Sequence, residues 1–320
     1  MCRCGGGMEI KKMKKVTTFV IDDVIWLFRD LTRQRPVSMF DNPFLACLKR
    51  AHDKFGLKIQ LNIFFRTDPY YGNDEFSLSE MTDAYKSEWA AASDWLKFGF
   101  HSKQEFPDYP YINADYDQVY DDFMQIRNEV YRFATPDNWS IAVLNHWRPM
   151  SKDGCRALYD CGVRLISATI GDRFDYDGDP MSLPYGHANR LLHNRKPETK
   201  IFIRDTKDKT IARSLTGYNH ITQEELDATH RTVKYVPDKE TGLVFKNFTT
   251  GLVHNLSTLD EIEDEMMGYV GNEYIGWGTH EQYFHKDYLA YQPEYEEKLM
   301  IATKVLYDNG YEFIFMQDLI

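Results

Sequence analysis

The alternation of strand-like and helix-like segments constrains the fold of this chain more than any other sequence feature. From residue 16 to about residue 170, short apolar runs typical of buried strands alternate with amphipathic runs typical of helices. The expected strands are 16–21, 57–65, 97–100, 140–144 and 163–168, and the expected helices are 44–55, 78–96, 115–133 and 152–161. Such alternation predicts an α/β fold in which helices cover a parallel sheet.

The alternation resumes near the C-terminus. Strands are expected at 251–255, 273–277 and 311–315, and helices at 258–270 and 294–309. An open doubly wound sheet and a closed barrel both satisfy this pattern. A dinucleotide-binding sheet would carry a glycine-rich turn after its first strand, and no such turn follows residue 21. A (β/α) barrel is therefore favoured.

Residues 171–250 interrupt the alternation with polar, turn-rich sequence. A structureless loop of this length is uncommon in a compact domain. We therefore expect an inserted subdomain with strands at 200–203 and 232–235. The predicted organisation is a flexible tail over residues 1–13, then one barrel domain over 14–320 that the insertion at 171–250 interrupts.

Charge and cysteine content narrow the partners and the compartment. The 320 residues include 38 Lys and Arg against 49 Asp and Glu, a net charge of −11 that repels phosphate backbones and anionic lipid. We therefore expect no nucleic acid and no membrane partner, and a homo-oligomer stays open. Five scattered cysteines form no disulfide framework, and no apolar run reaches the roughly 18 residues of a membrane span. Together with the lack of a signal-peptide hydrophobic region, these features predict a cytoplasmic protein.

Residues with metal-binding and acid–base chemistry follow several of the expected strands. They are Asp22 and Asp23 after the first strand, His101 after a middle one, Asn145, His146 and Arg148 after another, and His280 after the penultimate one. Ligands collect at the carboxyl ends of parallel strands, so this set suits a metal that activates water beside a separate base and acid. For the aspartate pair alone an exposed loop or helix cap is the alternative, and for His280 a packed core histidine.

His101 and Glu105 are four residues apart. On a local helix this spacing would direct both side chains at one ion. A packed histidine beside a solvated glutamate accounts for the same spacing.

These motifs resemble those of the polysaccharide deacetylases, the NodB-like carbohydrate esterases. The segment 18–23, TFVIDD, is similar to the family's first motif, and His101-Ser102-Lys103-Gln104-Glu105 is similar to its second. Arg148-Pro149 resembles the third motif, and His280 the late histidine of the fifth. The resemblance covers about residues 14–170 and 251–320. The chain departs from the family at Glu105, where the family has a second histidine, and the fourth motif is not located.

The resemblance implies a fold and a set of roles. The family fold is an irregular (β/α) barrel of about seven parallel strands. By analogy, the metal ligands are Asp23, His101 and Glu105, and the catalytic groups are Asp22 as base, Arg148 orienting it and His280 as acid. A backbone N–H near Met150 would bind the oxyanion. The implied cofactor is a divalent metal ion, Zn, Mn, Fe or Co. Because the carboxylate of Glu105 is a hard oxygen donor, its presence as third ligand shifts the metal preference of the site from Zn²⁺ towards Mn²⁺, Fe²⁺ or Mg²⁺.

Aromatic side chains near the strand ends are candidates for stacking on a sugar ring. Tyr109, Trp147 and Tyr283, with Met150, are the predicted substrate-binding residues, although packing in the core is the alternative for any tyrosine. The expected substrate is a small carbohydrate or an acylated amino sugar.

Three functions stay open at this point. The first is a metal-dependent hydrolase that removes an N- or O-acetyl group from a carbohydrate, or cleaves a related non-peptide C–N bond. The second is a non-catalytic carbohydrate-binding protein of the same fold with an altered metal site. The third is a glycosidase with paired carboxylates. Only the first strictly requires an ion.

Overall fold

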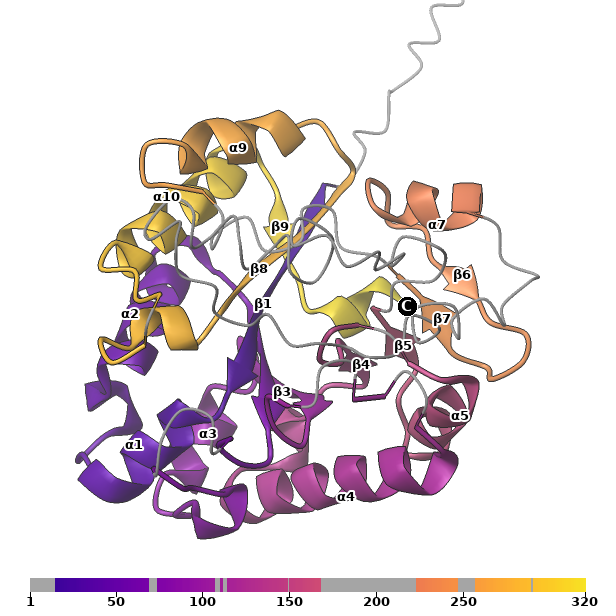
Figure 1. Ribbon diagram of the computed structural model, residues 1–320. Coiled ribbons are helices and arrows are strands. Elements are labelled where there is room, and N and C mark those ends of the chain that lie inside the picture. The colour runs from indigo at the N-terminus through magenta and orange to yellow at the C-terminus, as the bar shows by residue number, and fades with distance from the viewer. Residues whose placement is uncertain are drawn as a thin grey trace, which may run out of the picture.

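The structure is a computed structural model. It describes residues 15–68, 74–106, 110–111, 114–148, 150–167, 223–246, 257–288 and 290–320. Figure 1 shows strands β1 and β8 at the centre of the molecule, with helices α1, α2, α9 and α10 on one side and α4 and α5 on another.

The central sheet is parallel and buried. It has five strands in the order β3-β2-β1-β8, with β9 paired to the start of β1. The strands are β1 (Val16–Val24), β2 (Ile59–Phe64), β3 (Leu96–Ser102), β8 (Tyr274–His280) and β9 (Glu312–Phe313). Every residue of β1 and β2 is buried, as expected for parallel strands covered on both faces.

A second sheet of four strands has the order β4-β5-β7-β6. Its strands are β4 (Ala142–Val143), β5 (Leu165–Ile166), β6 (Val236–Pro237) and β7 (Val244–Phe245). The pairs of β5 with β4 and with β7 are parallel, whereas β6 is antiparallel to β7. β6 and β7 both lie within the predicted insertion, so the structure builds this part of the insertion into a sheet with β5.

Backbone hydrogen bonds join the two sheets. The N–H of Ser140 donates to the carbonyl of Phe98 at 2.8 Å, and the N–H of His146 donates to the carbonyl of His101 at 3.0 Å. The parallel strands therefore follow one another in the order β8-β1-β2-β3-β4-β5-β7. Within the described residues no strand ladder joins β7 to β8.

Side chains from opposite strands also meet inside this curved sheet. Val20 of β1 packs with Ala142, Leu144 and Leu165 of the second sheet and with Met316. Contact between such distant strands requires the sheet to curve around a shared interior. The described residues thus confirm the predicted α/β fold with a mostly parallel, barrel-like sheet.

Helices cover the outside of the sheet. The longer helices are α1 (Trp26–Gln34), α2 (Pro43–Phe55), α3 (Lys86–Ala91), α4 (Tyr116–Phe133), α5 (Lys152–Asp160), α7 (Gln223–Thr229), α9 (Ile262–Tyr269) and α10 (Tyr295–Asp308). Short 3-10 helices are η1 (Met39–Asp41), η3 (Leu78–Glu80), η4 (Pro136–Asn138), η7 (Gln282–Phe284) and η8 (Met316–Leu319). Their apolar faces pack on the strands in one large core that includes Phe19, Phe98 and Trp277.

Local sequence signals explain the bounds of the clearest helix. The side chain of Asn42 accepts hydrogen bonds from the N–H groups of Phe44 and Leu45, and Pro43 occupies the first turn of α2. Gly56 ends the helix with a φ of 74°, which glycine adopts without steric cost. The predicted helix 44–55 is therefore correct within one residue.

Several predicted elements differ from the structure. The single helix expected at 78–96 is wrong: η3, a turn and the short α3 occupy it. Thr82 breaks the helix there, since its Oγ1 accepts from the N–H of Ala84 at 3.2 Å and competes with helical hydrogen bonding. The strand expected at 232–235 lies instead at β6, and α1 was not predicted. The strands expected at 200–203 and 251–255 lie outside the described residues.

No helix in the described part of the chain combines the length and the apolar composition that a membrane span requires.

Candidate metal centre at the strand ends

Three side chains with metal-binding groups meet at the carboxyl ends of neighbouring strands. Asp23 lies at the end of β1, His101 near the end of β3 and His146 in the turn after β4. Oδ1 of Asp23 is 3.0 Å from Nε2 of His101 and 3.1 Å from Nδ1 of His146, and these two nitrogens are 3.2 Å apart. All three side chains are buried. One carboxylate oxygen and two imidazole nitrogens therefore form a compact triangle, the ligand triangle.

A backbone carbonyl holds the outer nitrogen of each imidazole. Nδ1 of His101 is 2.6 Å from the carbonyl of Leu144, and Nε2 of His146 is 2.8 Å from the carbonyl of Glu105. Because a carbonyl oxygen only accepts, the outer nitrogen of each ring donates its N–H. In the neutral tautomers the inner nitrogens then present lone pairs to each other and to Asp23. Metal-ligating histidines are oriented by this kind of contact.

The size of the ligand triangle fits a small divalent cation. Two donor atoms at about 2.1 Å from a transition-metal ion, at right or tetrahedral angles to each other, lie about 3.0–3.4 Å apart. The observed separations of 3.0, 3.1 and 3.2 Å fall within this range. Two imidazoles and one carboxylate suit Zn²⁺, Fe²⁺, Co²⁺ and Mn²⁺. The three donors could thus hold a metal ion.

The charges around the ligand triangle favour an ionised Asp23. Burial alone would raise the pKa of this carboxyl, but the charges of His280 and His146 and hydrogen bonds from His101 and His146 bring that pKa well below its usual range. Burial would lower the pKa of His101, but the charge of Asp22 and the hydrogen bond to Asp23 give a net upward shift. The cluster therefore favours positive charge at its centre, which a proton on an imidazole or a cation can provide.

Backbone strain is concentrated around the ligand triangle. Among the described residues, four that are not glycine have a positive φ: Asp23 at 62°, Arg35 at 46°, Trp147 at 56° and Arg148 at 69°. Arg35 ends α1, and the other three flank or belong to the cluster. Such conformations persist where the surrounding structure holds them, and they are frequent at functional sites.

Asp22 lies beside the ligand triangle and is nearly fully buried. Its Oδ1 accepts a 2.6 Å hydrogen bond from Nδ2 of Asn62 on β2. Burial lowers the pKa of Arg148, and the negative charge of Asp22 opposes this shift, so the guanidinium and the carboxylate interact electrostatically. Asp22 thus accepts a hydrogen bond from a neutral donor and interacts electrostatically with a cationic group.

His280 lies on the other side of Asp23, at the end of β8. Its Nε2 is 3.5 Å from Oδ2 of Asp23, and its side chain is 16% exposed, so it is more open to solvent than the triangle. Burial lowers the pKa of His280, although the charges of Asp23 and Asp22 act in the opposite direction. The ring of Tyr283 packs edge-on against it, with centroids 5.5 Å apart.

Glu105 is close to the cluster but does not belong to the ligand triangle. Its Oε1 lies 3.8 Å from Nε2 of His146, and its Oε2 accepts from Nε2 of Gln282 at 3.3 Å. The expected convergence with His101 assumed a helical turn, but β3 continues past His101 to Ser102, and the described residues 103–106 are not helical. The structure groups His146, in place of Glu105, with Asp23 and His101.

The structure places two of the predicted substrate-binding residues, Trp147 and Met150, in different surroundings. The ring of Trp147 lies 5.6 Å from that of His146, and Trp147 is partly exposed. The side chain of Met150 is buried against Gly154 of α5 and belongs to the main core. Tyr109 and Pro149 lie outside the described residues.

Sequence reasoning gave no role to His146 or to Asn62. The position of His146 directly after a buried strand was recognised, but nothing local indicated where its ring points. Asn62 lies two residues after Gln60 in the fully buried β2. Two polar side chains on the same face of a buried strand are a signal for a polar network.

The fold and the cluster define a parallel α/β protein with a candidate metal centre at its strand ends. No protein-family model and no curated protein matches the chain. It is similar to the solved structure of a 4-α-glucanotransferase from Thermococcus litoralis, with 10% identity, a TM-score of 0.52 and coverage of 96% of this chain. The present chain spans 40% of that protein's chain. This likeness concerns the fold.

Carbohydrate deacetylases are also among the similar solved structures. Agd3, described as a novel carbohydrate deacetylase, has 9% identity and a TM-score of 0.47, with coverage of 96% of this chain and 53% of that one. A family 4 acetyl xylan esterase from Clostridium thermocellum, in complex with a cobalt ion, has 12% identity and a TM-score of 0.40, with coverage of 95% and 90%.

Proposed function

We propose that the chain is a metal-dependent hydrolase that removes an acyl group from a carbohydrate. The observation that carries the proposal is the ligand triangle of Asp23, His101 and His146, with a second carboxylate and a second imidazole beside it. When bound, a divalent ion would polarise the acyl carbonyl and lower the pKa of a water molecule.

Asp22 is the proposed general base. It is adjacent in sequence to the ligand Asp23 but its own carboxylate is engaged by Asn62. The positive charge of Arg148 attracts this carboxylate. Asn62 therefore orients the proposed base through a hydrogen bond, and Arg148 interacts with it electrostatically.

His280 is the proposed general acid. It lies on the far side of Asp23 from His101 along the sheet, since β1 separates β8 from β2 and β3. Its lowered pKa makes its protonated form a stronger acid towards a leaving amine or alcohol. Base and acid thus lie on different strands that flank the same metal ligand.

The carbohydrate as substrate is inferred from the motif resemblance and from one aromatic ring. Trp147 is partly exposed and packs against His146, whereas Tyr283, which packs against His280, is buried in the main core. A partly exposed aromatic ring beside the ligand triangle suits the apolar face of a sugar ring. An acylated sugar would place its acyl group over the ligand triangle.

Metal titration of the purified protein tests the proposal. Metal-free protein titrated with Zn²⁺, Co²⁺ or Mn²⁺ in a calorimeter should bind one ion per chain. Loss of a residue that only orients a metal ligand costs about 10- to 100-fold in affinity, and His146→Ala should lower the affinity by more than this. Glu105→Gln is the matched control, and it should bind almost as tightly as the wild type. A larger loss of affinity in Glu105→Gln than in His146→Ala would make Glu105 the third ligand. Absence of metal binding by the wild type would refute the metal site.

Acetate release then separates the hydrolase from the binding protein. The metal-loaded chain should release acetate from acetylated sugars such as N-acetylglucosamine oligomers or acetylated xylose. If it binds these sugars but releases no acetate with any of Zn²⁺, Mn²⁺, Co²⁺ or Fe²⁺, the non-catalytic alternative replaces the proposed function.

A further inference from the structure

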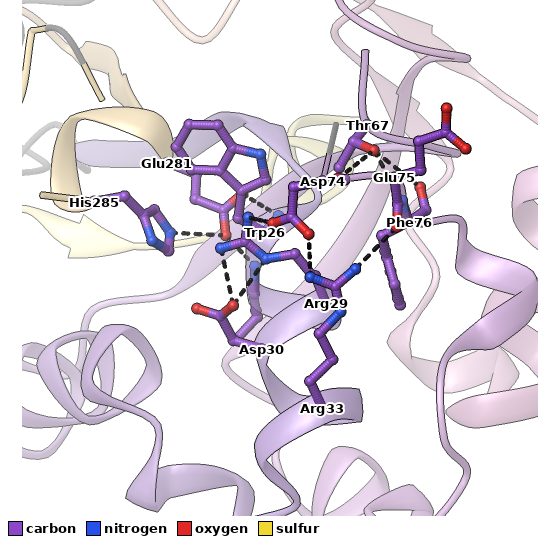
Figure 2. Close-up of polar contacts among 11 residues, drawn as sticks. Trp26, Arg29, Asp30, Arg33, Thr67, Asp74, Glu75, Phe76, Glu281 and His285 are labelled. Atoms are coloured by element: carbon purple, nitrogen blue, oxygen red, sulfur yellow. Dashed lines mark hydrogen bonds and ion pairs between the residues drawn. The ribbon is translucent and has the colours of Figure 1, made fainter. Parts of the chain in front are cut away.

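A buried glutamate that directly follows β8 holds the beginning of helix α1 (Figure 2). Oε2 of Glu281 accepts hydrogen bonds from the N–H groups of Ile25 at 2.7 Å and Trp26 at 2.9 Å. Its Oε1 accepts from the N–H of Leu27 at 2.6 Å. Glu281 is fully buried, so these three short bonds are protected from competing water.

Helix α1 needs such a partner because its own sequence offers none. The residue at its N-cap position is Ile25, whose apolar side chain cannot accept a hydrogen bond, and no local side chain caps the helix. The first N–H groups of a helix have no partner within the helix, and a negative charge is favourable there. The carboxylate that satisfies them comes from about 255 residues further along the chain.

The backbone of Glu281 makes a further contact on the other side of Asp23. Its N–H donates to the carbonyl of Asp22 at 3.1 Å. Glu281 therefore holds the chain immediately before Asp23, through Asp22, and shortly after it, through the first turn of α1. Asp23 itself has a φ of 62°, a conformation that L-residues rarely adopt and that the surrounding structure must hold.

Glu281 also follows His280 directly in the sequence. One residue thus connects the proposed acid, the proposed base and a metal ligand, although β1 and β8 are far apart in the chain. The imidazole of His285 lies 3.6 Å from Oε1 of Glu281 and packs edge-on against the ring of Trp26, with centroids 4.9 Å apart. These rings help to enclose the carboxylate (Figure 2).

We infer that Glu281 is a positioning residue of the metal centre. By fixing the backbone on both sides of Asp23, it keeps Asp23 in the left-handed conformation in which Oδ1 faces His101 and His146. The inference rests on the proposed metal site, and it assigns to Glu281 no contact with the ion or the substrate.

The variant Glu281→Gln tests this inference. A carboxamide has one acceptor oxygen, and its NH₂ group faces N–H donors, so it cannot satisfy all three amides. Metal affinity, measured by calorimetry, should fall about 10- to 100-fold, as for other residues that orient ligands. The absorption spectrum of the Co²⁺-loaded protein should change, because the Asp23 donor is displaced. Hydrogen exchange of the Ile25, Trp26 and Leu27 amides should become faster even in metal-free protein.

Asn42→Ala is the matched control, because it removes the side-chain cap of α2 away from the ligand triangle. It should lower stability while leaving the metal affinity and the Co²⁺ spectrum unchanged. Equal losses of affinity in Glu281→Gln and Asn42→Ala would show a general effect of destabilisation and overturn the inference. Unchanged affinity in Glu281→Gln alone would also overturn it, whereas absence of binding in the wild type would instead refute the proposed function.

Glu281→Asp covers the case in which the glutamine variant does not fold. Aspartate keeps the negative charge but is one methylene shorter than glutamate, so Glu281→Asp should retain the fold. Its metal affinity should be lower than that of the wild type and, where both variants can be measured, higher than that of Glu281→Gln. If Glu281→Asp has the metal affinity and the Co²⁺ spectrum of the wild type, accurate placement of the carboxylate is not needed and the inference is overturned.

Discussion

Nδ2 of Asn62 donates a 2.6 Å hydrogen bond to Oδ1 of Asp22, and both side chains are buried. The bond is the last in a chain of polar contacts inside the barrel. Ser140 donates to Oε1 of Gln60 at 2.8 Å, and Nε2 of Gln60 donates to Oδ1 of Asn62 at 2.8 Å. The network fixes which end of the Asn62 amide faces Asp22, and it thereby orients the proposed base from a neighbouring strand.

Asn62→Leu should therefore slow turnover without loss of metal. Leucine has the same number and branching of side-chain heavy atoms as asparagine but cannot donate, so Asp22 loses its orienting bond. A misplacement of about 1 Å in a reacting group can cost about 100-fold in rate, and we expect a loss in kcat of about 10- to 100-fold with unchanged metal affinity. An unchanged kcat would show that Asp22 needs no orientation from β2.

Substitution of each of the two adjacent aspartates should have a different effect, one on turnover and the other on metal binding. Asp22→Asn removes the proposed base but no ligand, so turnover should be lost while the metal stays bound. Asp23→Asn replaces an anionic donor with a neutral one and should weaken metal binding. Calorimetry and acetate release on both variants check this, and loss of metal in Asp22→Asn alone would show that the roles are exchanged.

Arg148→Met should lower turnover without loss of metal. The guanidinium interacts electrostatically with Asp22, so its removal takes away an attraction that helps to place the proposed base. Arg148→Lys, which keeps a positive charge, is the control and should lose less turnover. Wild-type turnover in Arg148→Met would exclude the electrostatic role.

Gly99→Ala should disturb the network that orients Asp22. A Cβ at this position of β3 would lie 2.4 Å from Nε2 of Gln60 and 2.5 Å from Oδ1 of Asn62, and both of these side chains are buried. Overpacking of this kind costs about 1–3 kcal/mol. Urea unfolding should show that loss, and kcat should fall with it. Gly268→Ala, where a Cβ meets nothing within 4 Å, is the control and should leave kcat unchanged.

Lys246 should make stability depend on pH in the alkaline range. It is buried beneath the ring of Tyr274, and burial lowers its pKa to about 7, with Glu273 opposing the shift. Between this value and the unfolded pKa of about 10.4 the unfolded chain binds more protons, so this residue makes stability rise with pH.

Comparison with Lys246→Met isolates this effect. The free energy of unfolding of the wild type minus that of the variant should increase by a few kcal/mol from pH 7 to pH 10, since one pKa unit corresponds to about 1.4 kcal/mol. Urea titrations at several pH values measure it. A constant difference would mean that Lys246 remains charged in the folded protein across this range.

Several parts of the fold were predictable because their signals are local. The apolar run at 16–21 gave β1, and the Asn42, Pro43 and Gly56 signals gave α2 within one residue. The order of strands and helices then placed Asp22, Asp23, His101 and His280 at one edge of a sheet, because parallel strands end at the same edge. Helix α1 was missed since its cap is supplied by the remote Glu281.

The sequence by itself thus determined the parallel α/β fold and the edge of the sheet at which chemistry can occur. Only the tertiary structure decided which groups meet there. Glu105 has the spacing of a ligand, yet pairing of β3 with the chain around β4 brings His146 to Asp23 and leaves Glu105 on the outer side of that ring. The direction of a side chain at a strand end depends on backbone contacts with distant segments, and these contacts exist only once the sheet has formed.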